Sequence, residues 1–324
     1  MNAPGLYLRQ YLSVLAPYLK RPDVTDLYIN RPEELWVETL GGKIERHDVS
    51  ALNEATIERL IGQVAAYAHQ GINRESPLLS ASLPDGARIQ VVAPPATRGP
   101  IAIAVRKQVM ADMTLDDYTA SGAFNAVRPN GQNEEIRDKL KALREEGAFA
   151  ELLRLAVKAR LNILISGGTA VGKTTFLNAL IREVPLQERL VVIEDTQEVL
   201  LPHPNSVSML AARNALGEAD VSMEDLLSAS LRMRPDRIIL GELRGPEALT
   251  FLRAVNTGHP GSITTIHADS PERAVEQLAL LILQAGTKLS RSDVQGYVRS
   301  SIDVFVQLRR VDGERVITQV ELAA

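Results

Sequence analysis

The sequence contains two kinds of hydrophobic pattern, and the change from one to the other falls near Leu161. After that residue, short and nearly continuous apolar runs are separated by segments with helical spacing. Such runs are typical of strands that are buried on both faces of a parallel sheet with helices on both sides. The predicted strands are Asn162–Ser166, Leu190–Ile193, Ile238–Leu240, Ile263–Ile266 and Val304–Leu308. Asp312-Gly313 then predicts a terminal hairpin with a last strand at Val316–Val320.

The first third of the chain mixes helical spacing with strand-like alternation and predicts a smaller α+β domain. It opens on an amphipathic helix whose apolar positions include Leu8, Leu12, Leu15 and Leu19. The following segments are predicted as a strand at Leu35–Thr39, a helix at Ile57–Ala68, strands at Leu78–Leu83 and Ile89–Val92, a loop at Ala93–Pro100 and a strand at Ile101–Val105. The Asp85-Gly86 pair is a strong hairpin signal between two of these strands.

The segment between these two parts, from Gln108 to Ala159, is charged and helical, and we interpret it as a linker that contains helices. Thr114–Asp117 resembles a capping box, and Gly147 separates two helical patterns. We therefore predict an N-terminal α+β domain over residues 1–107, a helical linker over residues 108–150 and a larger α/β domain over residues 151–324.

Composition narrows the class of protein. The 324 residues include 36 Lys and Arg against 40 Asp and Glu, so no overall basic field attracts nucleic acid, which we do not expect as the primary ligand. The absence of cysteine excludes disulfides and thiolate chemistry and fits a reducing cytoplasm. The N-terminus lacks a signal-peptide pattern, and no stretch reaches the roughly 20 apolar residues of a membrane span. We therefore expect a cytoplasmic protein whose membrane association is peripheral.

The most specific signal is Gly167-Gly168-Thr169-Ala170-Val171-Gly172-Lys173-Thr174, which matches the pattern G-x-x-x-x-G-K-[ST] of a phosphate-binding loop. The loop follows a predicted strand and precedes a helix that begins at Thr175, as the pattern requires. Glycines let backbone N–H groups surround phosphates, Lys173 adds a positive charge, and the Thr174 hydroxyl is a ligand for Mg²⁺. We therefore expect ATP and Mg²⁺ to bind along the loop and at Thr175. A glycine-rich structural turn is the alternative.

Acidic residues follow two other predicted strands. Glu194 and Asp195 come directly after one of them with Glu198 just beyond, and Glu242 comes after the other. In an open parallel sheet these strand ends lie beside the phosphate loop. Gly241 occupies the place where a Walker B strand usually carries Asp, so the candidates for metal contact are Glu194, Asp195 and Glu198. We assign Glu242 to orient or deprotonate the attacking water. Surface carboxylates that close strand loops are the alternative.

Two histidines and three arginines are further candidates. His267 ends a predicted strand and is a candidate sensor of the γ-phosphate, whereas structural and functional roles weigh equally for His259 in its Gly-His-Pro-Gly turn. No set of His, Asp and Glu with recognisable metal-ligand spacing surrounds either histidine. Arg88, Arg106 and Arg232 lie beside predicted strands, and each taken alone is typical of a solvated surface charge.

Several motifs, together with the phosphate loop and in the same order, resemble those of the secretion ATPase superfamily. They are Val192–Glu198, Leu231–Arg237, Gly241–Gly245 and Thr257–His267. Within that superfamily, three segments are similar to the traffic ATPases of type IV secretion and conjugation: Leu83–Gln90, Ala104–Lys107 and Thr114–Tyr118. The resemblance covers nearly the whole chain.

This resemblance implies a homohexameric ring of two-domain subunits. Each subunit would have a C-terminal RecA-like P-loop NTPase domain, with ATP bound near its junction with the smaller N-terminal α+β domain. The family pattern implies phosphate contact by Arg88 and Arg106, and a contribution of Arg232 across a subunit boundary. The sequence departs from the family at Ala170-Val171, where a small pair such as Gly-Ser is usual. The segment 108–159 is also long enough for exchange between neighbouring subunits.

The expected function is that of an ATP hydrolase that powers macromolecule translocation or pilus assembly, working with secretion subunits of the inner membrane. A pilus assembly or retraction ATPase of the same superfamily is the nearest alternative, and the N-terminal segments disfavour it. An ATP-controlled, DNA-binding RecA-like protein is an alternative of another class. The acidic composition and the lack of a basic, aromatic-rich stretch count against DNA as its ligand.

Overall fold

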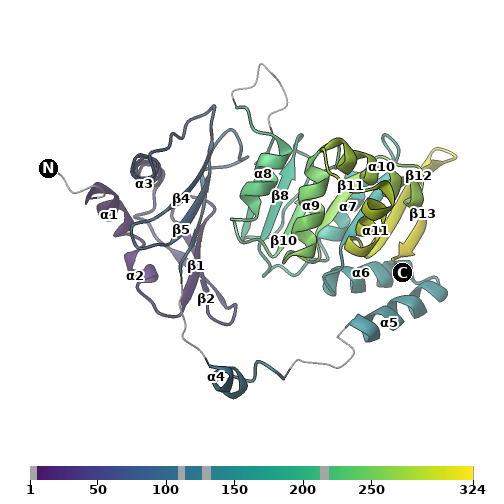
Figure 1. Cartoon of the computed structure of the whole chain (residues 1–324), viewed down its shortest axis with the longest axis horizontal. Coiled ribbons are helices and arrows are strands. Elements are labelled where there is room, and N and C mark those ends of the chain that lie inside the picture. Colours follow the sequence, from purple (N-terminus) through teal and green to yellow (C-terminus); the bar gives the residue numbers. More distant parts are fainter. Residues whose placement is uncertain (1–5, 109–113, 126–132, 212–218, 324) are drawn as a thin grey trace.

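The computed structural model describes residues 6–108, 114–125, 133–211 and 219–323, which contain two separate β-sheets. The N-terminal sheet and its helices lie on the left in Figure 1, and the larger C-terminal sheet lies on the right between layers of helices. Between them in the sequence comes α4 (Leu115–Ala120), which stands away from both sheets and buries none of its residues. The predicted capping box is present there, because Thr114 and Asp117 each bond to the backbone of the other.

The N-terminal sheet has six strands in the order β3-β2-β1-β6-β5-β4, and all neighbouring pairs are antiparallel. The strands are β1 (Val24–Ile29), β2 (Glu34–Thr39), β3 (Ile44–Asp48), β4 (Leu78–Ser82), β5 (Arg88–Val92) and β6 (Ala102–Arg106). One face packs on α1 (Leu6–Leu12), α2 (Ala16–Leu19) and α3 (Glu54–Tyr67). The other face contributes Tyr28, Trp36 and Ala104 to the core of the C-terminal domain.

The first helix is shorter than its apolar spacing predicts. The continuous helix through Leu19 is wrong, because a turn at Ser13–Leu15 separates α1 from α2. Pro17 lies in the first turn of α2, where its missing N–H costs nothing. In a continuous helix the same ring would clash with the carbonyl of Ser13 and remove a hydrogen bond. The leucines still share one side, and Leu8 and Leu15 are both buried.

The C-terminal sheet has seven strands in the order β13-β12-β7-β11-β10-β8-β9. The strands are β7 (Ile163–Gly167), β8 (Leu190–Glu194), β9 (Ser206–Leu210), β10 (Arg237–Leu240), β11 (Ile263–Ile266), β12 (Val304–Val311) and β13 (Glu314–Leu322). All neighbours are parallel except the terminal β12–β13 hairpin. Every predicted strand is therefore confirmed, and β1, β3 and β9 are strands that the sequence analysis did not identify.

Helices cover both faces of this sheet. One face packs on α6 (Phe149–Lys158) and α7 (Lys173–Ile181), and α5 (Asn133–Glu145) packs against α6 on its far side (Figure 1). The other face packs on α8 (Met223–Ser230), α9 (Glu247–Asn256), α10 (Pro271–Gln284) and α11 (Arg291–Ser301). Gly147 separates α5 from α6 as predicted and has a positive φ of 73°. Leu140 of α5 joins the buried core of the C-terminal domain, while the boundaries at residues 107 and 150 stay predictions.

The two domains of the chain meet through polar contacts that are fully buried at Arg189 and half-buried at Arg234. The guanidinium of Arg189 is fully buried, lies 4.1 Å from the centre of the Tyr28 ring and donates to Asn30 Oδ1 at 2.8 Å. Arg234 of the C-terminal domain donates to Glu38 Oε1 at 3.0 Å. Because such groups need partners when they lose water, these pairs specify one docking geometry for the domains.

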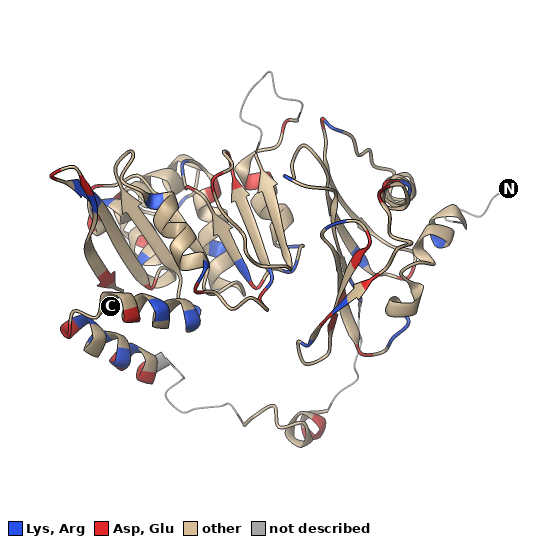
Figure 2. Cartoon of the chain, turned by 180° about the vertical axis from the view of Figure 1, so that it is seen from behind, with Lys and Arg blue, Asp and Glu red and all other residues tan. Residues whose placement is uncertain are grey.

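Charged side chains lie mainly at the surface of the molecule and away from the middle of the C-terminal sheet. Figure 2 shows them mainly on helices, on loops and at strand ends, while the middle of the C-terminal sheet carries few. Among the residues that the structure describes, no helix has the length and apolar character needed to cross a membrane.

Candidate nucleotide site

The phosphate-binding loop connects β7 to α7. Gly172 caps the helix with a φ of 93°, and Ala170 also has a positive φ, 61°, a conformation that favours glycine. At Gly167 a Cβ atom would lie 2.6 Å from Val171 Cγ2 and 2.8 Å from Leu308 O, so this position has no room for a side chain. The loop therefore delivers the N-terminus of α7, with its N–H groups, to the carboxyl edge of the sheet.

The Lys173 side chain lies back across this loop. Its Nζ is 3.1 Å from Gly167 O, 3.2 Å from Gly168 O and 3.1 Å from His267 Nδ1. Burial lowers the pKa of Lys173, and the nearby Glu242 carboxylate acts in the opposite direction. The ammonium thus lies where phosphate oxygens can replace the loop carbonyls as its partners.

A chain of polar contacts continues from Lys173 across the strand ends. His267 Nε2 lies 2.9 Å from Glu242 Oε1, and Arg244 donates to Glu242 Oε2 at 2.5 Å and to Asp195 Oδ2 at 3.0 Å. The order β7-β11-β10-β8 explains this sequence of contacts, because it places His267 between the phosphate loop and Glu242. The strand-end residues that the sequence predicts are therefore brought together.

Glu194 has a different environment. Its side chain is buried, its Oε1 accepts the N–H groups of Glu198 at 2.9 Å and Val199 at 2.7 Å, and its Oε2 pairs with Arg98 of the N-terminal domain. Burial raises the pKa of Glu194, and these donors oppose that shift. The carboxylate also explains Gly241, since a Cβ there would lie 3.2 Å from Glu194 Cγ.

A cavity of about 600 Å³ lies over the loop, a size typical of small-ligand sites. Its walls include every predicted binding residue from Gly168 to Thr175, together with Glu198, Glu242 and His267. Glu194 and Asp195 are absent from its described lining. The sequence analysis did not identify four further lining residues, which are Asn178, Arg244, Thr265 and Arg315. Arg315 comes from β13, and no local sequence pattern predicts that this strand contacts the loop.

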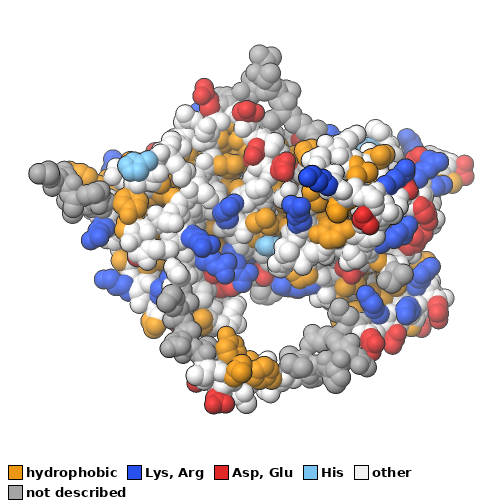
Figure 3. All heavy atoms as spheres, in the orientation of Figure 1, with side chains coloured by type: hydrophobic (Ala, Val, Ile, Leu, Met, Phe, Trp, Pro, Cys, Tyr) orange, Lys and Arg blue, Asp and Glu red, His pale blue; other side chains and the backbone are white. Residues whose placement is uncertain are grey.

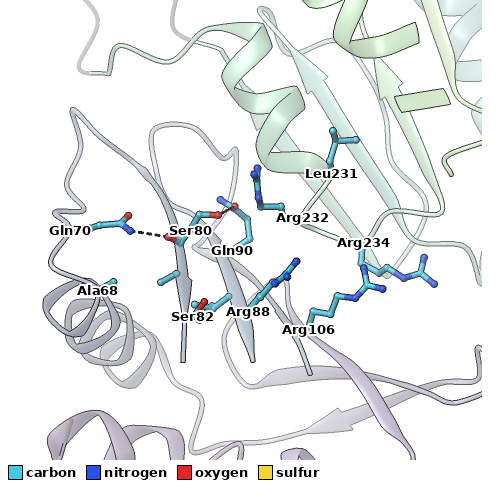
Figure 4. Close-up of a pocket in the computed structure, with 12 residues that line it drawn as sticks. Ala68, Gln70, Ser80, Ser82, Arg88, Gln90, Arg106, Leu231, Arg232 and Arg234 are labelled. Carbon is cyan, nitrogen blue, oxygen red and sulfur yellow. Dashed lines mark hydrogen bonds between the residues drawn. The ribbon is translucent and has the colours of Figure 1, made fainter. Parts of the chain in front are cut away.

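The three predicted arginines lie at a second cavity, of about 690 Å³, between the domains. Arg88 and Arg106 come from the N-terminal sheet, and Arg232 and Arg234 follow α8, so the four arginines lie on facing edges of the two domains (Figure 4). Figure 3 shows Lys and Arg side chains gathered where the domains meet. Among the described residues, this cavity shares no lining residue with the cavity over the phosphate loop.

His259 has a structural setting. Its Nδ1 lies 3.3 Å from Ala254 O at the end of α9, and burial lowers its pKa. In the same turn, a Cβ at Gly261 would lie 2.6 Å from Arg237 Nη1, and Ser262 Oγ accepts the N–H of Ile238 at 3.0 Å. This motif joins strand ends at the opposite edge from the phosphate loop.

The site residues fit a nucleotide with a bound divalent cation. The Thr174 hydroxyl and the Glu198 and Glu242 carboxylates line the cavity and supply the oxygen ligands that Mg²⁺ takes. Within the described ranges, no group of three or more His, Cys, Asp or Glu residues is placed to hold a metal ion. A cation here would therefore need oxygens from the nucleotide or water, as is usual for Mg²⁺.

A mostly parallel sheet with a phosphate loop at its carboxyl edge defines the C-terminal domain as a P-loop NTPase fold, to which the N-terminal domain is added. The chain belongs to the family described as type II/IV secretion system protein, whose model matches residues 10–313. This membership confirms the prediction of the secretion ATPase superfamily.

Curated relatives place the chain among type IV secretion ATPases. It is 37% identical to the type IV secretion system protein VirB11 of Bartonella quintana, over 95% of this chain and 91% of that protein. It is 38% identical to the type IV secretion system protein PtlH homolog of Bordetella bronchiseptica, over 94% of this chain and 91% of that protein. The crystal structure of the VirB11 ATPase from the Brucella suis type IV secretion system superposes with a TM-score of 0.90 at 36% identity, covering 98% and 97% of the two chains. The predicted fold class and the predicted secretion ATPase are confirmed.

Proposed function

We propose that this protein is a Mg²⁺-dependent ATPase whose ring-shaped homohexamer powers macromolecule translocation or pilus assembly in a type IV secretion system. The observation that supports this most directly is the continuous contact from Lys173 through His267 to Glu242 beneath one cavity. It joins a phosphate-binding cation to a carboxylate that can act on water.

The residues of the cavity divide between binding and chemistry. Lys173 and the N–H groups at the start of α7 bind the β- and γ-phosphates, and Thr174 with Glu198 is the proposed ligand set for the cation. Bound Mg²⁺ would neutralise charge that develops on the phosphate oxygens. Glu242 orients the attacking water and accepts its proton, while Arg244 holds one carboxylate oxygen and leaves the other toward His267. His267 links Glu242 to Lys173 and so responds to occupancy of the phosphate site.

Arg88, Arg106 and Arg232 are proposed to complete the ATP site of a neighbouring subunit. Arg88 and Arg106 are directly opposite each other on β5 and β6, and like charges in that relation repel. An anion between them removes the penalty. Because the arginine cavity and the phosphate-loop cavity of one chain are separate, a head-to-tail contact between subunits is the arrangement that joins them. Repetition of such a contact closes a ring when the rotation between neighbouring subunits divides a full turn evenly, which is the arrangement proposed here.

The proposed setting is the cytoplasmic face of the inner membrane. The family membership and the similarity to type IV secretion proteins support contact with inner-membrane secretion subunits. Peripheral attachment through those subunits agrees with the lack of a membrane-spanning helix in the described part of the chain.

Two variants test the ATP site. Lys173→Ala should abolish hydrolysis and weaken ATP binding, because the cavity loses the cation that lies in the phosphate loop. Glu242→Gln should keep ATP and Mg²⁺ binding and lose turnover, because an amide cannot accept a proton as a carboxylate does. Normal turnover by Lys173→Ala would remove the phosphate-loop assignment, and normal turnover by Glu242→Gln would remove the role of that residue.

Subunit mixing tests the shared site. Assemblies made of a single variant should hydrolyse ATP at least tenfold more slowly than wild type, whether the variant is Arg88→Ala, Arg106→Ala or Lys173→Ala. Each variant loses a charge-assisted contact to phosphate, and such a contact contributes about 1.5–3 kcal/mol. If sites form between subunits, an equal mixture of Arg106→Ala and Lys173→Ala proteins regains about a quarter of its sites. A mixture with no more turnover than its components would contradict sharing. Unchanged turnover in both arginine variants would contradict any nucleotide role for them.

A further inference from the structure

A loop of the N-terminal domain extends the C-terminal sheet. β9 is the edge strand of that sheet, and residues 96–98, between β5 and β6, pair with it in antiparallel fashion. Leu210 N donates to Ala96 O at 3.0 Å, and Arg98 N donates to Ser208 O at 3.2 Å. The backbone of Arg98 is thus fixed against the ATPase domain, although the residue belongs to the other domain.

The side chain of Arg98 reaches past β9 to the segment that follows β8, residues 195–200, which we call the acidic turn because it contains Asp195 and Glu198. Its Nη2 pairs with Glu194 Oε2, and its Nη1 donates to Val199 O at 3.0 Å. Because Glu194 Oε1 accepts the Val199 N–H, both backbone polar groups of Val199 are held by this ion pair. Only 14% of the Arg98 side chain and 2% of the Glu194 side chain are exposed, so water cannot replace either partner easily.

The turn held in this way carries one wall of the ATP cavity. Glu198 lines the cavity, and its N–H is bonded by Glu194. Asn178 of α7 accepts the Leu200 N–H at 2.8 Å and donates to Glu198 O at 3.1 Å. Residues 198–200 are therefore held both by the N-terminal domain, through Arg98 and Glu194, and by the helix of the phosphate loop, through Asn178.

We propose that Arg98 is a positioning residue for ATP hydrolysis, which sets Glu198 at the nucleotide through Glu194 and makes turnover depend on the docking of the N-terminal domain. The proposal rests on the role proposed above for Glu198 at the cation. A guanidinium suits this task because its fixed fork reaches a carboxylate and a carbonyl together. Without it, Glu194 is a buried carboxylate that has lost its cationic partner. It is relieved either by taking up a proton, which weakens its bonds to the Glu198 and Val199 N–H groups, or by a movement of the turn. Such a movement displaces Glu198.

The test compares steady-state ATP hydrolysis by full-length assemblies of Arg98→Ala, Arg98→Lys and a matched control, Arg31→Ala. Arg31 also crosses the domain boundary, donating to Pro204 O at 3.2 Å, but it touches no part of the acidic turn. Arg98→Ala should lower kcat roughly 10- to 100-fold, the effect expected of a misplaced group, while KM for ATP changes less than about threefold. Arg98→Lys should recover part of kcat, and Arg31→Ala should match wild type.

A double variant separates positioning from a general loss of structure. Because Arg98 acts through Glu194, Arg98→Ala combined with Glu194→Gln should be no slower than the slower single variant, instead of showing the product of both effects. Size and thermal unfolding are measured for each assembly, and Arg98→Lys replaces Arg98→Ala throughout if the alanine protein does not assemble.

The outcomes distinguish this proposal from the one on which it rests. Turnover within about twofold of wild type in the assembled Arg98 variant overturns it, as do independent, multiplicative effects in the double variant. If kcat falls as much in Arg31→Ala as in Arg98→Ala, the proposal is also overturned, because domain docking in general would then be responsible. Glu198→Gln is assayed in parallel. Normal turnover there rejects the proposed role of Glu198 itself, and so removes the basis for Arg98.

Discussion

The buried ion pair of Arg237 should contribute strongly to the thermal stability of the ATPase domain. Its guanidinium is 0% exposed and bonds Glu188 through two contacts of 2.6 and 2.9 Å. It also donates to Val157 O at 2.7 Å and Gly261 O at 3.3 Å, and so joins β10, the end of α6 and the turn before β11. Replacement by methionine keeps much of the apolar stem and removes every donor.

The expected loss is large because the partners stay buried. Glu188 would keep Arg160 at 3.3 Å as its cation, and two buried carbonyls would each lose a donor. Removing one member of a buried ion pair costs about 3–5 kcal/mol. For a domain of 150–250 residues, where Tm falls by about 2–4 °C per kcal/mol, Arg237→Met should melt about 6–20 °C below wild type.

Thermal unfolding at one protein concentration and without nucleotide is the measurement, because assembly and ligands shift Tm. The matched control is Arg154→Met, which breaks contacts to Glu183 at 3.3 Å and Glu151 at 3.5 Å but starts from a side chain that is 52% exposed. Such a surface pair is worth about 0–1 kcal/mol. Pairing Arg237→Met with Glu188→Leu should recover part of the loss, since no charge then stays buried. If Arg237→Met melts within about 2 °C of the control, the argument from burial is wrong.

Four further outcomes are expected. Gly241→Asp, which restores the usual Walker B residue, should lower both turnover and Tm, because its Cβ meets Glu194 Cγ at 3.2 Å; a gain in turnover would contradict this. Ala170→Gly should leave Tm unchanged or raise it slightly, since relief of the strained φ of 61° offsets the added freedom of the unfolded chain, and a clear loss of Tm would count against strain. Arg315→Ala should raise KM for ATP about three- to tenfold by loss of a cation at the cavity, while Arg310→Ala on the same hairpin should not; equal KM values would exclude phosphate contact. Because burial lowers the pKa of His203, the unfolded chain takes up its proton first as pH falls, so stability should decline below about pH 6.5. His203→Gln should show a smaller decline in Tm between pH 7.5 and 5.5, and an identical decline would reject the assignment.

Features that a short stretch of chain can encode follow from the amino-acid sequence alone. The buried strands of the C-terminal sheet are predicted because apolar runs such as Leu190–Ile193 leave no residue suited to a solvent-facing or loop position. Asp85-Gly86 and Asp312-Gly313 were identified as hairpin turns because positive φ angles favour these residues, and Gly86 and Gly313 have φ angles of 86° and 89°. The phosphate loop was found because its chemistry lies within consecutive residues.

Contacts between residues far apart in the sequence depend on the folded chain. β9 alternates polar and apolar positions over only five residues, and it is fixed as a strand because β8 and residues 96–98 pair with its two edges. Arg98 and Arg315 give no local signal, since one reaches Glu194 across a domain boundary and the other reaches the phosphate loop from the last hairpin. The order of the strands in the sheet places His267 between Lys173 and Glu242, and the hydrophobic pattern of the sequence does not specify that order. Local propensity acts over a few residues, whereas these contacts depend on how whole elements pack, and that is why only the folded chain settles them.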